Sequence, residues 1–195
     1  MRVHIDAALG EAATALAQLR TNEAALSAIG TAAEILISAF NAENKVYSCG
    51  NGGSLCDAMH FAEELSGRWR KNRRALGAVS MSDPSHMSCV ANDFGYDEVF
   101  ARYVEAMGRS GDVLVAISTS GTSRNVLRAC DAARARGMRI IALTGRPASA
   151  VGARADVDIC TPVGEYADRV QELHIKTIHI LIELVERGLF PELYP

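Results

Sequence analysis

Two side chains capable of acid–base chemistry lie four residues apart in a segment with a helical pattern. His60 and Glu64 have the spacing that places an imidazole and a carboxylate on one face of a helix. Such a pair is most often a simple helix contact, but it can also transfer protons or share a metal ion. Which role is open to it depends on the elements around it.

A glycine-rich turn precedes this helix. Residues 49–70 have the pattern of a strand end, a turn at 50–53 and a helix that Ser54 opens. This arrangement gathers backbone N–H groups and the positive end of the helix dipole at one point, which suits an anion. The sequence therefore predicts a polar pocket edge beside His60 and Glu64.

A second polar loop, at residues 118–123, follows another predicted strand and leads into a helix. Its serine and threonine hydroxyls can donate to a phosphate without any lysine or arginine. The alternative is a hydroxyl-rich loop in which Ser123 is an ordinary helix N-cap. The matching position of the two loops, each after a predicted strand, favours phosphate binding.

Four polar residues outside these loops are further candidates for ligand contacts. Asn92 and Asp93 are expected in a turn, where their simplest role is turn chemistry, although both side chains can hold hydroxyl groups. Gln171 and His179 lie in the final helix and could complete a metal site with the first pair. Their separation corresponds to ~12 Å of helix, near the limit that two side chains can bridge through one ion. Metal binding is therefore possible but not required.

Apolar runs alternate with helical patterns from residue 45 onward. Strands are expected at 45–49, 76–81, 112–117, 138–144 and 157–160, and helices at 54–70, 96–107 and 123–136. This alternation is typical of βαβ units, so we expect an α/β fold with a parallel sheet of these five strands. In such sheets ligands bind beyond the carboxyl ends of the strands.

Helices are also expected at both ends of the chain. Two apolar stripes near the N-terminus predict a helical pair that breaks at Thr21 and Asn22. The last helix, 166–187, is apolar around most of its circumference, which predicts burial and an oligomer interface. We expect one domain, made of a helical hairpin (1–43), an α/β core (44–165) and a C-terminal helix and tail (166–195).

The composition is that of a soluble globular protein: 195 residues, 49% hydrophobic, 22% charged, with a net charge of −3. We expect no nucleic-acid or membrane partner, no signal peptide and no membrane-spanning run. Five scattered cysteines without a CxxC pair are typical of reduced thiols in a cytoplasm. One basic run, at 68–74 around Trp69, is expected to be a solvated helix end; the alternative is a surface that contacts phosphate or a partner.

Five motifs together resemble those of a known enzyme family. They are Cys-Gly-Asn-Gly-Gly-Ser at 49–54, Asp-Ala-Met-His-Phe-Ala-Glu-Glu at 57–64, Cys-Val-Ala-Asn-Asp-Phe-Gly at 89–95, Ile-Ser-Thr-Ser-Gly at 117–121 and the run 166–176. In this order, over essentially the whole chain, they resemble the sedoheptulose-7-phosphate isomerases (phosphoheptose isomerases) of the sugar isomerase (SIS) domain superfamily.

The resemblance implies a three-layer, doubly wound SIS fold, similar to that of flavodoxin, and a cytoplasmic homotetramer. It also implies an aldose–ketose isomerase whose substrate is a sugar phosphate. Such an enzyme converts sedoheptulose 7-phosphate to D-glycero-D-manno-heptose 7-phosphate through an enediol. This reaction is the first step toward nucleotide-activated heptose.

The resemblance further implies roles for particular residues. Glu64 would be the catalytic base and His179 its acid/base partner, and one zinc ion per subunit would be bound by His60, Glu64, Gln171 and His179. Residues that would bind the substrate are Asn51, Gly52, Gly53, Ser54, Glu64, Asn92, Asp93, Ser118, Thr119, Ser120, Ser123 and Gln171. Zinc ligation would make Glu64 a poorer free base, so we favour its role as base.

A rival hypothesis is a non-catalytic SIS-fold protein that binds a sugar phosphate or the bacterial replication initiator. The joint presence of Glu64, Gln171 and His179 argues against it, because a scaffold has no reason to hold these three together. The basic run around Trp69 is the only feature that favours it.

Overall fold

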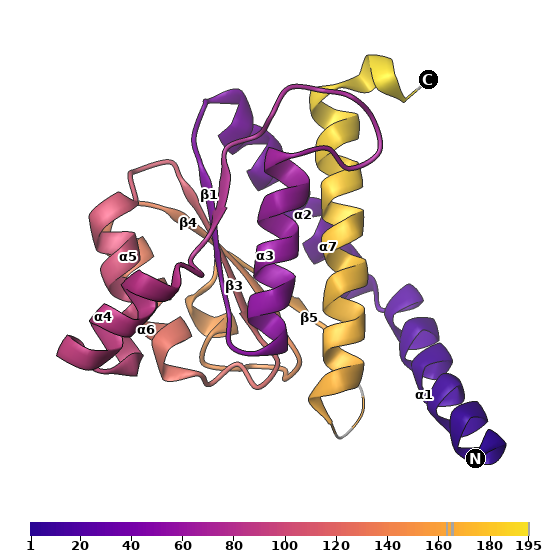
Figure 1. Cartoon of the computed structure of the whole chain (residues 1–195). Helices are drawn as coiled ribbons and strands as arrows, with labels where there is room; N and C mark the ends of the chain where they lie inside the picture. Colours follow the sequence, from indigo (N-terminus) through magenta and orange to yellow (C-terminus); the bar gives the residue numbers. More distant parts are fainter. Residues whose placement is uncertain (163, 165, 195) are drawn as a thin grey trace.

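The computed structural model describes residues 1–162, 164 and 166–194. Its centre is a parallel sheet in the order β2-β1-β3-β4-β5 (Figure 1). The strands are β1 (Val46–Cys49), β2 (Ala78–Ser80), β3 (Val113–Ser118), β4 (Arg139–Thr144) and β5 (Val157–Cys160). This order is that of flavodoxin-type doubly wound sheets, so the predicted fold class is confirmed.

The central strand β3 shows why this sheet is buried on both faces. All of its residues are buried, and successive side chains point to opposite faces. Val115 and Ile117 belong to the core cluster on one face, whereas Leu114 and Ala116 belong to the cluster on the other. A continuous apolar run is therefore required here, as is typical of parallel sheets covered on both sides.

Helices cover both faces and give three layers (Figure 1). One face carries α2 (Glu23–Asn41), α3 (Gly53–Ser66) and α7 (Ala167–Leu189), and the other carries α4 (Pro84–Phe94), α5 (Val99–Met107) and α6 (Arg124–Ala135). Short 3₁₀ turns lie at Tyr96–Glu98, Gly152–Arg154 and Pro191–Leu193. Because β1 leads into α3 and β3 leads into α6, the two predicted polar loops flank the point where the strand order reverses.

The predicted N-terminal helical pair consists of α1 (Arg2–Arg20) and α2. Asn22 caps α2, and its Oδ1 accepts a hydrogen bond from Ala25 N at 3.1 Å. The N-terminal part of α1 projects from the body of the chain (Figure 1), and its apolar residues Ile5 and Leu9 are exposed. Within the described chain, much of the apolar stripe of α1 is therefore left uncovered.

By length and composition α2 could cross a membrane, whereas the sequence predicts no membrane-spanning run. Its residues Ile29, Leu36 and Phe40 are buried in the core cluster beneath the sheet. Packing on the sheet therefore accounts for the apolar side of this helix.

Several predicted elements differ from the structure in their bounds, and two of them lie beside the predicted site residues. The helix expected at 54–70 ends at Ser66. Asn92 and Asp93, expected in a turn, lie in the last turn of α4. Asp83 caps that helix by accepting a hydrogen bond from His86 N at 2.7 Å, and a proline follows the cap. These strong start signals outweigh the turn preference of an Asn-Asp pair.

His174 of α7 is a fully buried histidine. Its Nε2 lies 3.3 Å from the carbonyl oxygen of Thr144 at the end of β4, while Nδ1 has no partner in the described chain. Burial lowers the pKa of His174 to about 4, and the contact with Thr144 opposes this only in part. The folded protein therefore holds His174 neutral.

We expect His174 to make the fold acid-sensitive. The unfolded chain binds the proton near the ordinary pKa of 6.5, whereas the folded chain resists it down to about 4, so stability is lost as the pH falls through this window. The loss in the free energy of unfolding is at most about 3 kcal/mol. Urea unfolding across the window, at fixed protein concentration, measures it.

The matched variants are His174→Gln, which should reduce the loss, and His4→Gln at an exposed position, which should not. An equal loss in the wild type and in His174→Gln would contradict this assignment.

Candidate active site

α3 and α7 lie side by side and run in the same direction (Figure 1). At their N-terminal ends Gly53 lies against the side chain of Gln171, since a Cβ atom at Gly53 would be only 2.7 Å from Gln171 Nε2. About two turns further along, His60 of α3 meets His179 of α7, which is 119 positions away in the sequence. Helix packing thus brings the distant parts of the site together.

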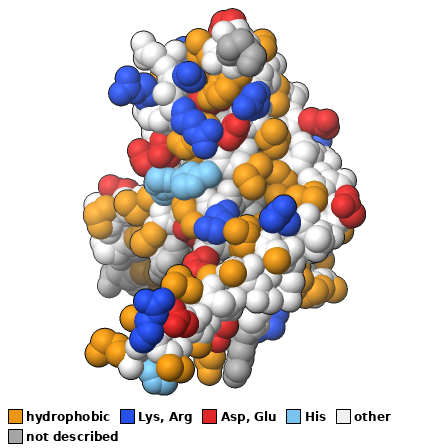
Figure 2. All heavy atoms as spheres, turned by 90° about the vertical axis from the view of Figure 1, so that its right-hand side faces the viewer, with side chains coloured by type: hydrophobic (Ala, Val, Ile, Leu, Met, Phe, Trp, Pro, Cys, Tyr) orange, Lys and Arg blue, Asp and Glu red, His pale blue; other side chains and the backbone are white. Residues whose placement is uncertain are grey.

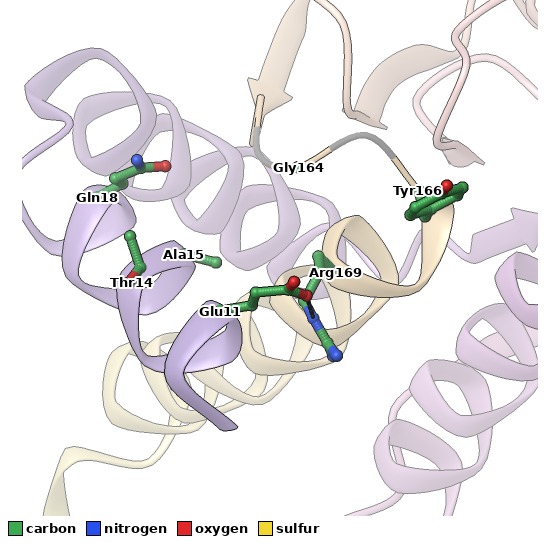
Figure 3. A pocket seen from close by; sticks show the side chains of 7 residues that line it. All are labelled: Glu11, Thr14, Ala15, Gln18, Gly164, Tyr166 and Arg169. Atoms are coloured by element: carbon green, nitrogen blue, oxygen red, sulfur yellow. Dashed lines mark hydrogen bonds and ion pairs between the residues drawn. The ribbon is translucent and has the colours of Figure 1, made fainter. Parts of the chain in front are cut away.

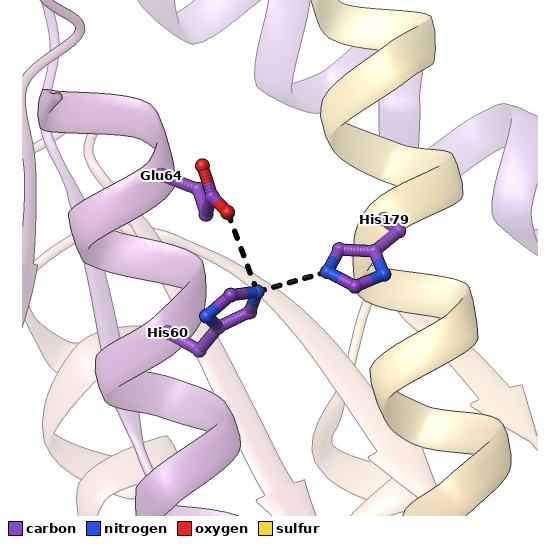
Figure 4. Close-up of side chains that lie close together, drawn as sticks. All are labelled: His60, Glu64 and His179. Carbon is purple, nitrogen blue, oxygen red and sulfur yellow. Dashed lines mark hydrogen bonds and ion pairs between the residues drawn. The ribbon is translucent and has the colours of Figure 1, made fainter. Parts of the chain in front are cut away.

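His60, Glu64 and His179 converge on one point (Figure 4). The Nε2 atoms of His60 and His179 are 2.8 Å apart, and His60 Nε2 lies 3.6 Å from Glu64 Oε1. One ligand atom from each residue lies within 4.8 Å of the other two. Figure 2 shows histidine side chains at the surface of this side of the molecule, below a group of basic and acidic side chains. In the single chain the cluster is partly exposed, with 32% of the His60 side chain and 18% of the Glu64 side chain accessible to solvent.

Glu63 orients His60 from the other side of the ring. Glu63 Oε1 lies 3.1 Å from His60 Nδ1, so Nδ1 is the donor and Nε2 presents its lone pair to the cluster. Two imidazole nitrogens and a carboxylate oxygen are a donor set typical of zinc. His60, Glu64 and His179 could therefore hold a metal ion.

The electrostatic setting suits proton transfer. Burial lowers the pKa of His179, and charge on His60 lowers it further, while Glu64 opposes the change. Asp57, one turn before His60 on α3, is a group that the sequence analysis does not single out. Burial raises the pKa of Asp57 to about 6, and its Oδ2 has no hydrogen-bond partner in the described chain. Its spacing of three residues from His60 is the signal that could have identified it.

The Gln171 amide lies away from this cluster. Gly53, against which the amide lies, precedes His60 by seven residues, which corresponds to about 10 Å of helix. Within one chain, Gln171 is therefore placed to contact a ligand at the glycine turn rather than an ion between the two histidines.

The glycine turn depends on close backbone approach. A Cβ atom at Gly50 would lie 2.7 Å from the carbonyl carbon of Ser54, and Gly52 has a φ of +55°. The side-chain amides of Asn51 and Asn125 exchange two hydrogen bonds, at 2.9 and 2.8 Å. This pair ties the turn after β1 to α6. No local pattern marks Asn125, because its partner is 74 positions away.

The loop after β3 gathers its hydroxyl groups. Ser118 Oγ lies 3.2 Å from Ser123 Oγ and accepts a hydrogen bond from Gly121 N at 3.1 Å. Ser120 Oγ accepts one from Thr122 N at 3.3 Å. Ser123 makes no side-chain capping bond to α6. Ser123 therefore occupies the N-cap position of α6 without using its hydroxyl as a cap, and phosphate binding by this loop stays a prediction.

Asn92 and Asp93 are exposed at the end of α4. Asn92 Nδ2 donates to Asp93 Oδ1 at 2.7 Å. The Tyr96 hydroxyl, a few residues later, donates to Asn51 Oδ1 at 3.3 Å. This segment therefore borders the glycine turn, whereas the histidine cluster lies further along α3.

A separate cavity of about 390 Å³ lies between α1 and the start of α7 (Figure 3). It is lined by Glu11, Thr14, Ala15, Gln18, Gly164, Tyr166 and Arg169. Arg169 Nε lies 3.4 Å from Glu11 Oε2, and Arg169 also pairs with Glu172. None of the predicted site residues lines this cavity.

Comparisons with known proteins point to one family. A family model described as SIS domain matches residues 10–145. The phosphoheptose isomerases of Edwardsiella ictaluri and Aeromonas hydrophila are 58% and 59% identical over 181 residues, which cover 93% of this chain and 94% of each relative. The solved phosphoheptose isomerase of Neisseria gonorrhoeae has a TM-score of 0.88 and 37% identity, and the match covers 95% of this chain and 98% of that chain.

A double-mutant cycle tests the contact between Gly53 and Gln171. Gly53→Ala should stabilise a Gln171→Ala background more than the wild type, because alanine is favoured over glycine in helices but in the wild type the new Cβ must displace the end of the Gln171 side chain. We expect a coupling of at least about 0.5 kcal/mol in urea unfolding.

Gly30→Ala is the control, because a Cβ atom there would meet nothing within 4 Å. It should have the same effect in both backgrounds. Additive effects of Gly53→Ala and Gln171→Ala would rule out the contact.

Proposed function

The chain belongs to the SIS domain family and, within it, to the phosphoheptose isomerases, and we propose that it interconverts sedoheptulose 7-phosphate and D-glycero-D-manno-heptose 7-phosphate. The resemblance carried by the five motifs is confirmed by these relatives, as is the prediction of an aldose–ketose isomerase. The observation that carries the proposal in this chain is the convergence of Glu64 and His60 with His179. The product would feed the synthesis of nucleotide-activated heptose.

Glu64 is the base that we assign to the carbon-bound proton. Isomerisation moves one proton between C1 and C2 and a second between the two oxygens, with an enediol in between. A carboxylate with only 18% of its side-chain surface exposed can take the first proton and return it to the neighbouring carbon. His179 serves the second transfer, because its lowered pKa keeps a neutral imidazole that both accepts and donates.

The two polar loops would hold the rest of the substrate. For the phosphate we assign the hydroxyls of Ser118, Thr119, Ser120 and Ser123, and for the sugar Asn51, Gly52, Gly53, Ser54, Asn92, Asp93 and Gln171. A phosphate held away from the reacting carbons supplies orientation at the reaction centre. The Asn51–Asn125 pair supports this assignment, because it keeps the two loops in a constant relative position.

We infer that His60, His179 and Glu64 hold one zinc ion per subunit. When bound, the ion supplies a Lewis acid that polarises the substrate carbonyl. Gln171 as a further ligand stays a prediction, since its amide lies at the glycine turn in this chain. The roles of Glu64 as ligand and as base compete, and we favour the base.

The remaining assignments concern the assembly and the location. We infer a homotetramer, and the exposed apolar residues Ile5 and Leu9 of α1 support it. We also infer a cytoplasmic location, which is supported by the five free cysteines. The mass of the protein in solution tests the tetramer. The basic run that favours the replication-initiator alternative is smaller than the sequence predicts, because the Arg73 side chain is buried while Arg68, Arg70, Lys71 and Arg74 stay exposed.

Glu64→Gln and His179→Gln should each lower kcat by about 10²–10⁴-fold, the usual contribution of a positioned acid or base. The measurement is conversion of sedoheptulose 7-phosphate, with circular dichroism to show that each variant is folded. Glu34→Gln, at an exposed position on α2, is the matched control and should keep full activity. Near-wild-type turnover in Glu64→Gln would remove the assignment.

Zinc binding should depend on Glu63 as well as on the ligands. Glu63→Gln leaves His60 without its charged partner and should weaken zinc binding by about tenfold in competition with a coloured chelator. Removal of metal by the chelator should reduce isomerase activity, and added zinc should restore it. His86→Gln, whose ring contacts the Val99 carbonyl instead, is the control. Wild-type affinity in Glu63→Gln would exclude this orienting role.

A further inference from the structure

One residue of the basic run after α3 differs from the solvated helix end that the sequence predicts, while Arg68, Arg70, Lys71 and Arg74 are exposed. Arg73 has no exposed side-chain surface, and neither has its partner Glu186 of α7. Arg73 Nε donates to Glu186 Oε1 at 2.8 Å. Burying two charges is costly unless good geometry and further hydrogen bonds compensate. The contacts around this pair therefore decide whether it can be buried without destabilising the fold.

The other donors of Arg73 bind backbone carbonyls at the end of α3. Nη2 donates to the carbonyl oxygen of Glu64 at 2.7 Å, and Nη1 donates to those of Leu65 and Gly67 at 2.9 and 2.8 Å. The last carbonyls of a helix lack intrahelical partners, and the rigid fork of a guanidinium can satisfy several at once. Tyr194 adds a hydrogen bond from its hydroxyl to the second carboxylate oxygen of Glu186. One side chain thus joins the end of α3 to α7.

The loop that contains Arg73 also borders the histidine cluster. The ring of Trp69 lies 6.5 Å from that of His179, between centroids. The Arg70 guanidinium stacks 3.9 Å from the Trp69 centroid and pairs with Glu183 of α7 at 3.1 Å. Figure 1 shows this loop crossing to the C-terminal half of α7. The loop therefore forms a wall beside His179.

We propose that Arg73, through its buried pair with Glu186, is a positioning residue for the active site. It sets the separation of α3 and α7 at which Glu64 and His60 meet His179, and it holds Trp69 against His179. The bond from Arg73 to the Glu64 carbonyl places this link on the same residue that carries the base. The expected effect on turnover rests on the proposed function, whereas the expected effect on the packing of α3 against α7 does not.

Arg73→Met tests the proposal, and Arg74→Met is its matched control at the adjacent, exposed arginine. Trp69 is the only tryptophan in the chain, so acrylamide quenching of the protein's fluorescence measures how exposed Trp69 is beside His179. In Arg73→Met we expect stronger quenching, zinc binding weakened about tenfold and kcat lowered about 100-fold. KM should stay within about threefold of the wild-type value, because the loop at residues 118–123, to which we assign the phosphate, does not contact Arg73 and keeps its contribution to substrate binding. Arg74→Met should match the wild type in quenching, zinc affinity, kcat and KM.

Removing one partner of a buried ion pair can prevent folding. Glu186→Gln and Tyr194→Phe are therefore made in parallel; the first keeps a hydrogen-bonding group, and the second removes only the hydroxyl bond. Both variants should show stronger quenching, weaker zinc binding and a lower kcat, each to a smaller extent than Arg73→Met. Folded variants that lose stability but keep wild-type quenching, zinc affinity and kcat would overturn the proposal. A wild type without isomerase activity would instead refute the proposed function, while quenching and zinc affinity would still test the role of Arg73.

Discussion

α3 and α7 pack side by side on one face of the sheet, and every candidate catalytic group depends on that contact. Phe61 and Leu65 of α3 and Ile178 and Ile182 of α7 belong to the same buried cluster. Burial of this apolar surface supplies the attraction between the helices, but it is non-directional. The two helices also meet at three levels: Gly53 lies against the Gln171 side chain, His60 contacts His179, and Arg73 pairs with Glu186. The apolar packing holds the helices together, and the proposed role of Arg73 is to fix which side chains meet.

The sheet supplies a second constraint, because its strand order reverses between β1 and β3. The loops after these two strands therefore lie on either side of the reversal, where doubly wound folds bind their ligands. The reciprocal amide pair of Asn51 and Asn125 joins the glycine turn to the helix after the hydroxyl loop. A substrate that spans from the hydroxyl loop to the histidine cluster would thus be bound by elements whose separation is set by the sheet and by side-chain hydrogen bonds between them.

Much of the fold is predictable from local patterns. Apolar runs bounded by glycine turns identify the strands, and Asn22 marks the start of α2 through its own hydrogen bond to Ala25. The errors arise where two local signals compete, as at Asn92 and Asp93, where the cap at Asp83 extends a helix through a favoured turn pair. The burial of Arg73 has no local signature at all, because its partner lies on a helix 113 positions away.

The sequence by itself determined the residue types of the site, the i, i+4 face of His60 and Glu64, and the order of strands and helices, because these depend on neighbours within a few residues. Only the tertiary structure decided which distant groups meet. It placed His179 at the cluster, the Gln171 amide at the glycine turn, and Arg73 in a buried pair. The physical reason is that the separation and alignment of α3 and α7 come from packing on the sheet and from buried polar contacts, and neither is encoded in the spacing of residues along either helix.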